Sequence, residues 1–188
     1  MKAILTKIII LTLILFFVNN YAYSQAGTGQ VNVNLSLPEI TLVDIEPGFS
    51  NSINFTISPS SRGGESAIIQ KTTNETLWIN YTSSLSDGQN SRSIKAEISQ
   101  GTLPQGVDLF LEASPYSGTG DGSLGISDGK IELSSQPKPI ISGIGNCYTG
   151  DGISNGHQLS FSIEISNYSE INAVDNAYFL VLYTITDN

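Results

Sequence analysis

The sequence predicts an all-β fold, an antiparallel β-sandwich of about nine or ten strands, immunoglobulin-like or jelly-roll-like. Three observations predict it. Apolar and polar residues alternate with a period of two along much of the chain, as in strands that bury one face. Clusters of Gly, Pro, Asn and Ser separate these runs, as hairpin connections require. After the first two dozen residues almost no segment has the apolar period of a helix. A closed barrel is the alternative.

The strands follow from the residue pattern in order along the chain. Five runs alternate between an apolar and a polar face: 31–37, 53–58, 77–82, 94–99 and 159–165. Four more have the composition of strands: 40–45, 107–113, 130–133 and 140–144. The last run, 177–186, is apolar on both faces, which predicts a central strand that is covered on both sides.

Two glycine-rich stretches are predicted to be connections. SGTGDGSLGISDG at 117–129 has few large apolar side chains, so we expect a surface loop. The SDGK sequence at 127–130 contains an Asp-Gly pair of the kind that closes tight hairpins. TGDGISNG at 149–156 is expected to be a flexible connection between two strands.

The N-terminal residues predict export. Two lysines accompany an apolar run at 8–18, and the small residues Ala22 and Ser24 stand at the −3 and −1 positions of a cleavage site. The run is shorter than the roughly 20 apolar residues of a membrane-spanning helix, although an uncleaved anchor is the alternative. We therefore expect residues 1–24 to be a signal peptide. Residues 25–188 are expected to form one β-sandwich domain that passes the periplasm and reaches the exterior or the cell surface.

The charge of the chain restricts its partners. Acidic residues outnumber basic ones by 17 to 8, which gives a net charge of −9, and the predicted signal peptide carries two of the lysines. Nucleic-acid binding needs clustered Lys and Arg, and anionic membrane surfaces attract the same residues. We therefore expect no nucleic-acid partner and no membrane insertion of the mature chain.

A single cysteine and a single histidine lie close together in the sequence IGNCYTGDGISNGHQL, at Cys147 and His157. One cysteine excludes an internal disulfide and leaves pairing between chains open. Cysteine and histidine together can form a thiolate nucleophile with its base, whereas zinc needs three or four ligands. We interpret this stretch as a connecting loop, and expect a protein that is not an enzyme and has no cofactor.

We expect no bound metal, and the alternative is a calcium ion, because exported proteins are exposed to calcium. Asp121, Asp128 and Asp151 lie in glycine-rich loops, where carboxylate and carbonyl oxygens can converge. Their spacing is not that of a helix-flanked calcium loop. These three residues are the candidate ligands of a stabilising calcium ion.

Aromatic side chains are the candidates for a carbohydrate site, because sugar rings stack on aromatic faces. Trp78 lies on the strand face opposite Leu77 and Ile79 and is the first candidate for sugar stacking. Tyr81, Tyr116 and Tyr148 are further candidates. The alternative for Trp78 is a place in the apolar core.

The C-terminal sequence AYFLVLYTITDN, preceded by QLSFSIEISN, resembles the closing hairpin of secreted bacterial surface domains. Pilin-like subunits and WxL-type cell-surface domains end in this way. The resemblance is confined to the C-terminal strands. It implies a β-sandwich that builds appendages or coats cells and that catalyses no reaction.

The strand predicted directly behind the cleavage site has two interpretations. Its apolar side chains, Val31, Val33, Leu35 and Leu37, either begin the protein's own sandwich, which we favour, or exchange as a strand with the sheet edge of a neighbour. The sequence thus predicts a secreted structural or adhesive subunit, similar to a fimbrial subunit, that assembles with itself or with other surface proteins. The alternative is a carbohydrate-binding module whose partners are glycans.

Overall fold

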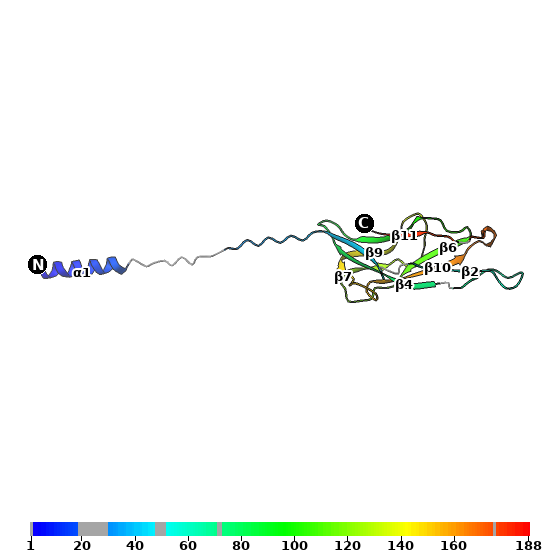
Figure 1. Cartoon of the computed structure of the whole chain (residues 1–188). Coiled ribbons are helices and arrows are strands. Elements are labelled where there is room, and N and C mark those ends of the chain that lie inside the picture. The colour runs from blue at the N-terminus through cyan, green and yellow to red at the C-terminus, as the bar shows by residue number, and fades with distance from the viewer. Residues whose placement is uncertain (1, 19–29, 48–51, 71–72, 175) are drawn as a thin grey trace. The chain divides into compact units, whose positions relative to one another are not determined.

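The computed structural model describes residues 2–18, 30–47, 52–70, 73–174 and 176–188. The chain divides into two units, Met1–Ser36 and Leu37–Asn188. The first unit contains helix α1 (Lys2–Val18), which includes both lysines and the apolar run of the predicted signal peptide (Figure 1). It also contains residues 30–36, which have no secondary structure. Among the described residues, no helix combines the length and the apolar character needed to cross a membrane.

The second unit is built from strands, with one short 3-10 helix, η1 (Tyr168–Glu170), in its described part. The strands are β1 (Ile40–Glu46), β2 (Ile57–Ser58), β3 (Ile68–Ile69), β4 (Thr73–Ser84), β5 (Arg92–Gln100), β6 (Val107–Ala113), β7 (Asp121–Ser127), β8 (Ile131–Glu132), β9 (Lys138–Tyr148), β10 (His157–Ile165) and β11 (Leu180–Asp187).

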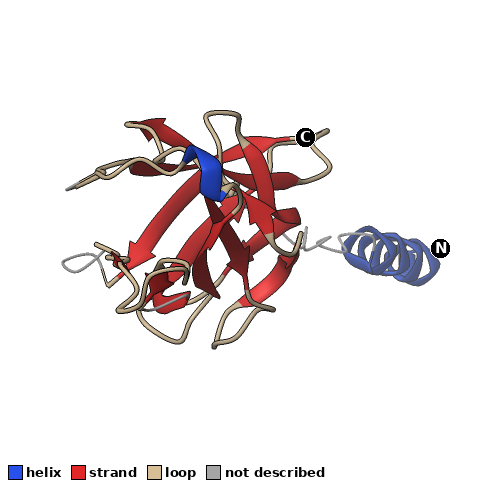
Figure 2. Ribbon diagram, turned by 90° about the vertical axis from the view of Figure 1, so that its right-hand side faces the viewer, coloured by secondary structure: helices blue, strands red, loops and turns tan. Residues whose placement is uncertain are grey.

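Strand pairing gives two layers. One layer has the order β1-β4-β10-β6-β8 and the other the order β11-β5-β9-β7, while β2 and β3 form a separate pair. The layers join at one corner, where Thr82 and Ser83 of β4 pair with Tyr148 and Cys147 of β9. All pairs are antiparallel. Figure 2 shows the strands around a shared interior. The predicted all-β, sandwich-like fold is confirmed, and the described strands do not close into a barrel.

The core forms because alternate side chains of both layers point into this interior. In β10, Leu159, Phe161 and Ile163 are buried, while the residues between them are partly exposed. The same alternation holds for β6. The period of two that predicts these strands therefore also identifies the side chains that hold them together.

Several predicted elements differ from the structure, beginning with the first and the last predicted strands. Residues 31–37 are not a strand, and the first strand of the second unit is β1. The last strand, β11, is not central, because within the described residues it pairs only with β5 at the end of its layer. Its apolar outer face is left open: Leu180 and Leu182 are 38% and 46% exposed.

The stretch predicted as a surface loop, 117–129, contains β7. Its glycines permit the pairing, since a side chain at Gly122 would lie 2.1 Å from the backbone oxygen of Asn146 in β9. The predicted hairpin at 127–130 is also wrong, because β7 pairs with β9 and β8 pairs with β6. The predicted strand 53–58 is reduced to β2.

Candidate functional site

Cys147 and His157 lie in strands on either side of the predicted loop. Cys147 is near the end of β9 and pairs with Ser83 of β4 and Gly122 of β7. His157 is the first residue of β10 and pairs with Ile79. Burial raises the pKa of the Cys147 thiol to about 11, so the thiol stays protonated at neutral pH. A protonated, buried thiol is a poor nucleophile.

The His157 imidazole is fully buried and acts as a structural link. Its Nδ1 lies 2.7 Å from the Ser114 carbonyl oxygen and its Nε2 lies 2.9 Å from the Tyr81 hydroxyl group. The Tyr81 hydroxyl group also lies within hydrogen-bond distance of the carbonyl oxygen of Leu124 in β7, and its single proton serves one of these two acceptors at a time. Burial lowers the pKa of His157, which favours a neutral ring that donates from Nδ1. This polar cluster therefore links β4, β7 and β10 inside the sandwich.

The connection at 149–156, whose sequence predicts a flexible loop, is held by several hydrogen bonds. The Thr149 hydroxyl group is buried and accepts from the Tyr81 backbone N–H at 3.0 Å. The Asn80 side chain accepts from the Gly152 N–H at 2.9 Å and donates to the Asn155 backbone oxygen at 2.5 Å. The polar residues of this loop thus serve its attachment to β4.

The three predicted calcium ligands lie on different segments. The Asp121 carboxylate accepts from the Gly122 N–H at the start of β7, and Asp128 accepts from the Ser142 hydroxyl at 2.7 Å. Asp151 lies in the loop after β9 and is exposed. Among the residues that the structure describes, no group of three or more His, Cys, Asp or Glu side chains could hold a metal ion.

The predicted aromatic candidates do not form one surface. Trp78 is half-buried in β4, in register with Glu46 of β1 and Gln158 of β10. Tyr81 is in the core, and the Tyr116 hydroxyl donates to the Thr149 carbonyl oxygen at 3.1 Å. Tyr148 is 51% exposed.

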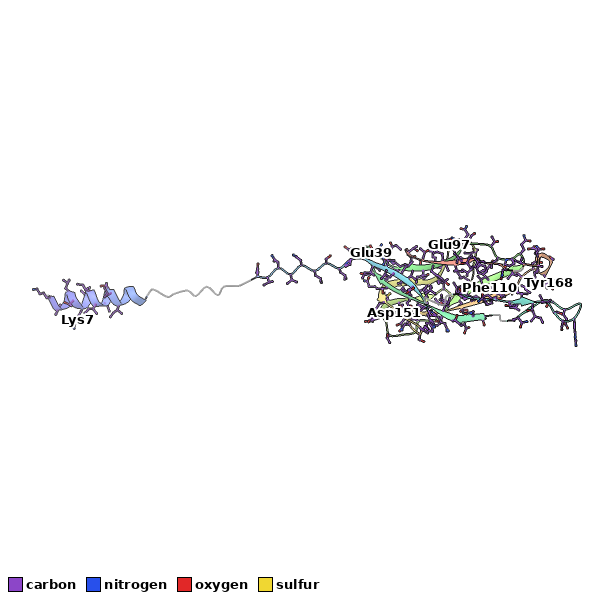
Figure 3. The ribbon with its side chains drawn as sticks, in the orientation of Figure 1. Lys7, Glu39, Glu97, Phe110, Asp151 and Tyr168 are labelled. Atoms are coloured by element: carbon purple, nitrogen blue, oxygen red, sulfur yellow. The ribbon has the colours of Figure 1, made fainter. Side chains whose placement is uncertain are left out.

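A shallow groove of about 480 Å³ lies beside Tyr148. Leu42 and Asp44 of β1, Thr82 of β4 and the exposed Asp151 also line it. Figure 3 shows Asp151 toward the same end of the second unit as Glu39, with Tyr168 toward the other end. Of the aromatic candidates, Tyr148 is therefore the one that presents a ring to solvent beside carboxylates.

The segment before β1 presents a row of apolar side chains to solvent. Val31, Val33, Leu35 and Leu37 are 85%, 84%, 92% and 78% exposed. The residues from 30 to 37 carry no charge and no secondary structure. Contiguous exposed apolar groups of this kind usually mark an interaction site, because water contact with them is unfavourable.

Glu39 and Ile40, which follow this segment in the sequence, contact a buried arginine. Arg92 of β5 is 1% exposed and forms ion pairs with Glu39 and with Asp187, the latter at 2.7 Å. It also donates to the backbone oxygens of Ile40 and Ser84, at 2.8 and 3.2 Å. Arg92 thereby ties the start of β1 to the end of β11.

An apolar groove of about 350 Å³ lies at the other end of β1 and β11. Its lining includes the core residues Leu77, Leu109 and Phe161, together with residues of β1, of 52–55 and of the region from 177 into β11. None of its lining residues is charged. The groove therefore reaches down to core residues, which remain buried at its floor.

Sequence reasoning missed this groove because residues far apart in the chain form it. The one available signal was the apolar outer face of 177–186, which predicts cover on both sides, whereas the structure leaves one side open. Comparison with family models, with curated proteins and with solved structures finds no match to this chain.

Proposed function

We propose that this protein is an exported, non-catalytic structural subunit of a cell surface, similar to a fimbrial subunit, and that it assembles by strand addition. In this proposal, residues 31–37 of one molecule pair with the exposed sheet edge of a neighbour. The observation that carries the proposal is the row of four exposed, alternating apolar side chains directly before β1. Strand addition provides main-chain hydrogen bonds for affinity and pockets for alternate side chains.

The energy of burial supports a role in assembly. Burying one Val or Leu side chain contributes about 1.5–3 kcal/mol, so four such residues are a strong driving force toward a partner. Ordering the segment opposes this gain by roughly 1–2 kcal/mol for each backbone residue. Assembly therefore also requires a complementary edge that orders the segment. The signal-like N-terminus and the resemblance of the C-terminal strands to surface domains agree with this role.

The test compares two double variants of the exported, processed chain by size-exclusion chromatography and negative-stain microscopy. Val33→Asp with Leu35→Asp places charges on the apolar face of the segment, and we expect ladders or fibres to disappear. Asn32→Asp with Asn34→Asp adds the same charge on the polar face and should still assemble. If the first variant assembles like the unmodified chain, the proposed function is wrong.

A second candidate function is glycan binding at Tyr148, because this ring is exposed in a groove with Asp44 and Asp151. Aromatic faces stack on sugars, and carboxylates accept hydrogen bonds from sugar hydroxyl groups. A glycan array probed with the unmodified chain, Tyr148→Ala and Trp78→Ala tests it. A binding signal that Tyr148→Ala removes and Trp78→Ala retains supports this function, whereas no signal on any glycan contradicts it.

A further inference from the structure

We infer that the groove beside Tyr148 binds an oligosaccharide of amino sugars, whose protonated amines pair with its carboxylates and whose rings stack on the Tyr148 side chain. This inference rests on the second candidate function, glycan binding at Tyr148, and names the class of glycan. It does not depend on strand addition, since residues 31–37 are not among the described residues that line the groove.

A row of side chains crosses four neighbouring strands on the outer face of the sheet. Leu42 of β1 is in register with Thr82 of β4, and Thr82 is in register with Tyr148 of β9. Tyr148 is in turn in register with Asp121 of β7. Residues in register on neighbouring strands lie on the same face of a sheet. Leu42 and Tyr148 are 64% and 51% exposed, so this row faces solvent.

The row has the length of a short oligosaccharide. Neighbouring strands lie about 4.8 Å apart, so the three spacings from Leu42 to Asp121 span about 14 Å, enough for a short chain of linked sugar rings. Tyr148 lies within the row, with Thr82 on one side and Asp121 on the other. A sugar ring that stacks on Tyr148 therefore has protein contacts for its neighbours in both directions.

The groove carries negative charge, and none of its described lining residues is basic. Asp44 and Asp151 line it, and Asp121 lies beside Tyr148 in the row. All three carboxylates are exposed, and none of them forms an ion pair with a described residue. A cation is the charge that complements them. A protonated amine is also attracted by the face of an aromatic ring such as Tyr148.

The carboxylates lie on separate segments, which favours several spaced cations over a single ion. Asp44 is in β1, Asp121 is in β7 and Asp151 is in the loop after β9. Within the described part of the chain, no three acidic, histidine or cysteine side chains could hold a metal ion. An oligosaccharide with one amine on each ring places its charges at intervals, so that each amine reaches a different carboxylate.

The loop that carries Asp151 is held against the sheet. The Asn80 side chain of β4 accepts from the Gly152 N–H and donates to the Asn155 backbone oxygen. The Asn155 side chain donates to the Asp151 backbone oxygen at 2.7 Å. A loop that is already ordered loses less conformational entropy when a ligand binds. Asp151 is therefore placed beside the groove before the sugar arrives.

A basic peptide is the other polymer with spaced cations, and the geometry favours the sugar. Extended peptides add to the edge of a sheet, and helical peptides lie in an apolar groove. The row through Tyr148 instead crosses the strands on the face of the sheet. It presents an exposed aromatic ring, on which sugar rings stack.

Isothermal titration calorimetry of the exported, processed chain with three probes tests the inference. The probes are the linear tetramer of glucosamine, its N-acetylated form, which has the same rings without charge, and tetralysine, which has charge without sugar. At pH 6.5 we expect the glucosamine tetramer to bind at least about tenfold more tightly than either other probe. Added salt should weaken its binding, because salt screens exposed charges.

Two changes in the groove should weaken binding of the glucosamine tetramer. Tyr148→Ala removes the ring, and we expect the dissociation constant to rise at least about tenfold. Asp44→Asn with Asp151→Asn removes two charges at nearly constant size, and we expect a rise of about three- to tenfold. All three side chains are exposed, so thermal unfolding of both variants should match that of the unmodified chain.

Matched controls make the same kinds of change outside the groove. Tyr178→Ala removes another tyrosine ring, which is 74% exposed. Asp108→Asn with Glu112→Gln removes two charges from β6. None of these three residues is in the described lining of the groove. We expect both controls to leave the dissociation constant within about twofold, since distant exposed charges are screened.

The outcomes separate this inference from the second candidate function. If the N-acetylated tetramer binds as tightly and Tyr148→Ala weakens its binding, glycan binding at Tyr148 stands and the amino-sugar class is wrong. If tetralysine binds as tightly as the glucosamine tetramer, the groove recognises charge alone and the inference fails. If the groove variants bind like the controls, the ligand occupies another surface, and both the inference and the second candidate function fail.

Discussion

At the scale of single residues, Arg92 and His157 are fully buried polar side chains that hold strands together. Each finds its partners in several strands: Arg92 in β1, β4 and β11, and His157 through Tyr81 in β4 and the Ser114 carbonyl after β6. A buried polar group is costly without partners, so each of them specifies one arrangement of the strands that surround it.

His157 predicts a pH dependence of stability. Burial lowers its pKa in the folded state below the usual 6.5, so the unfolded chain binds more protons than the folded chain just below that pH. The free energy of unfolding is therefore fully retained above about pH 6.5 and decreases as the pH falls below it.

Urea denaturation at pH 7.5 and pH 5.5 checks this expectation. His157→Asn retains an amide that can donate to Ser114 but does not titrate, and His157 is the only histidine in the chain. We expect this variant to be less stable at pH 7.5 by about 1–3 kcal/mol, since Tyr81 loses a partner. Its loss of stability between the two pH values should be smaller than that of the unmodified protein. Equal losses would contradict the assignment.

At the scale of elements, glycine explains why the predicted loop at 117–129 contains a strand. A glycine-rich composition predicts a loop, yet 121–127 forms β7 because the absence of side chains lets it approach β9. The alternating runs at 77–82, 94–99 and 159–165 form strands as predicted, since side chains large enough to fill the core occupy one face.

We expect Gly122→Ala to destabilise the fold by about 2 kcal/mol or more. Its φ is +99°, and the added carbon would lie 2.1 Å from the Asn146 backbone oxygen in β9. Gly129→Ala is the matched control, because its φ is +80° and no atom lies within 4 Å of the added carbon. The control should lose only about 1–2 kcal/mol, the cost of the left-handed backbone. Thermal or urea unfolding measures both, and equal losses would contradict the close approach of β7 to β9.

Residues 31–37 and β11 show why local pattern does not determine pairing. Both have strand-like sequences. Neither sequence pattern determines which strand pairs with these segments, because strand pairing depends on the tertiary fold of the whole chain. Among the strands that the structure describes, none pairs with residues 31–37, and β11 pairs only with β5.

At the scale of the whole molecule, the exposed segment contributes to assembly and not to the stability of one subunit. Deleting residues 30–36 should leave the free energy of unfolding unchanged within about 0.5 kcal/mol under conditions where the unmodified chain is monomeric, since these side chains are exposed. Denaturant unfolding at low protein concentration measures it. A loss of several kcal/mol would show that the segment packs on its own subunit.

The sequence by itself determined the all-β class, most of the strand positions and the core-facing side chains, because each follows from the period of two and from the turn residues between runs. It also identified the apolar residues of 31–37 as candidates for strand exchange. Only the tertiary structure decided that these residues are not the first strand and that β11 is an edge among the described strands. It also decided that Cys147 and His157 are buried within strands and that a groove lies beside β11. These features depend on which distant segments meet, and the local alternation of side chains is the same whichever partner a strand finds.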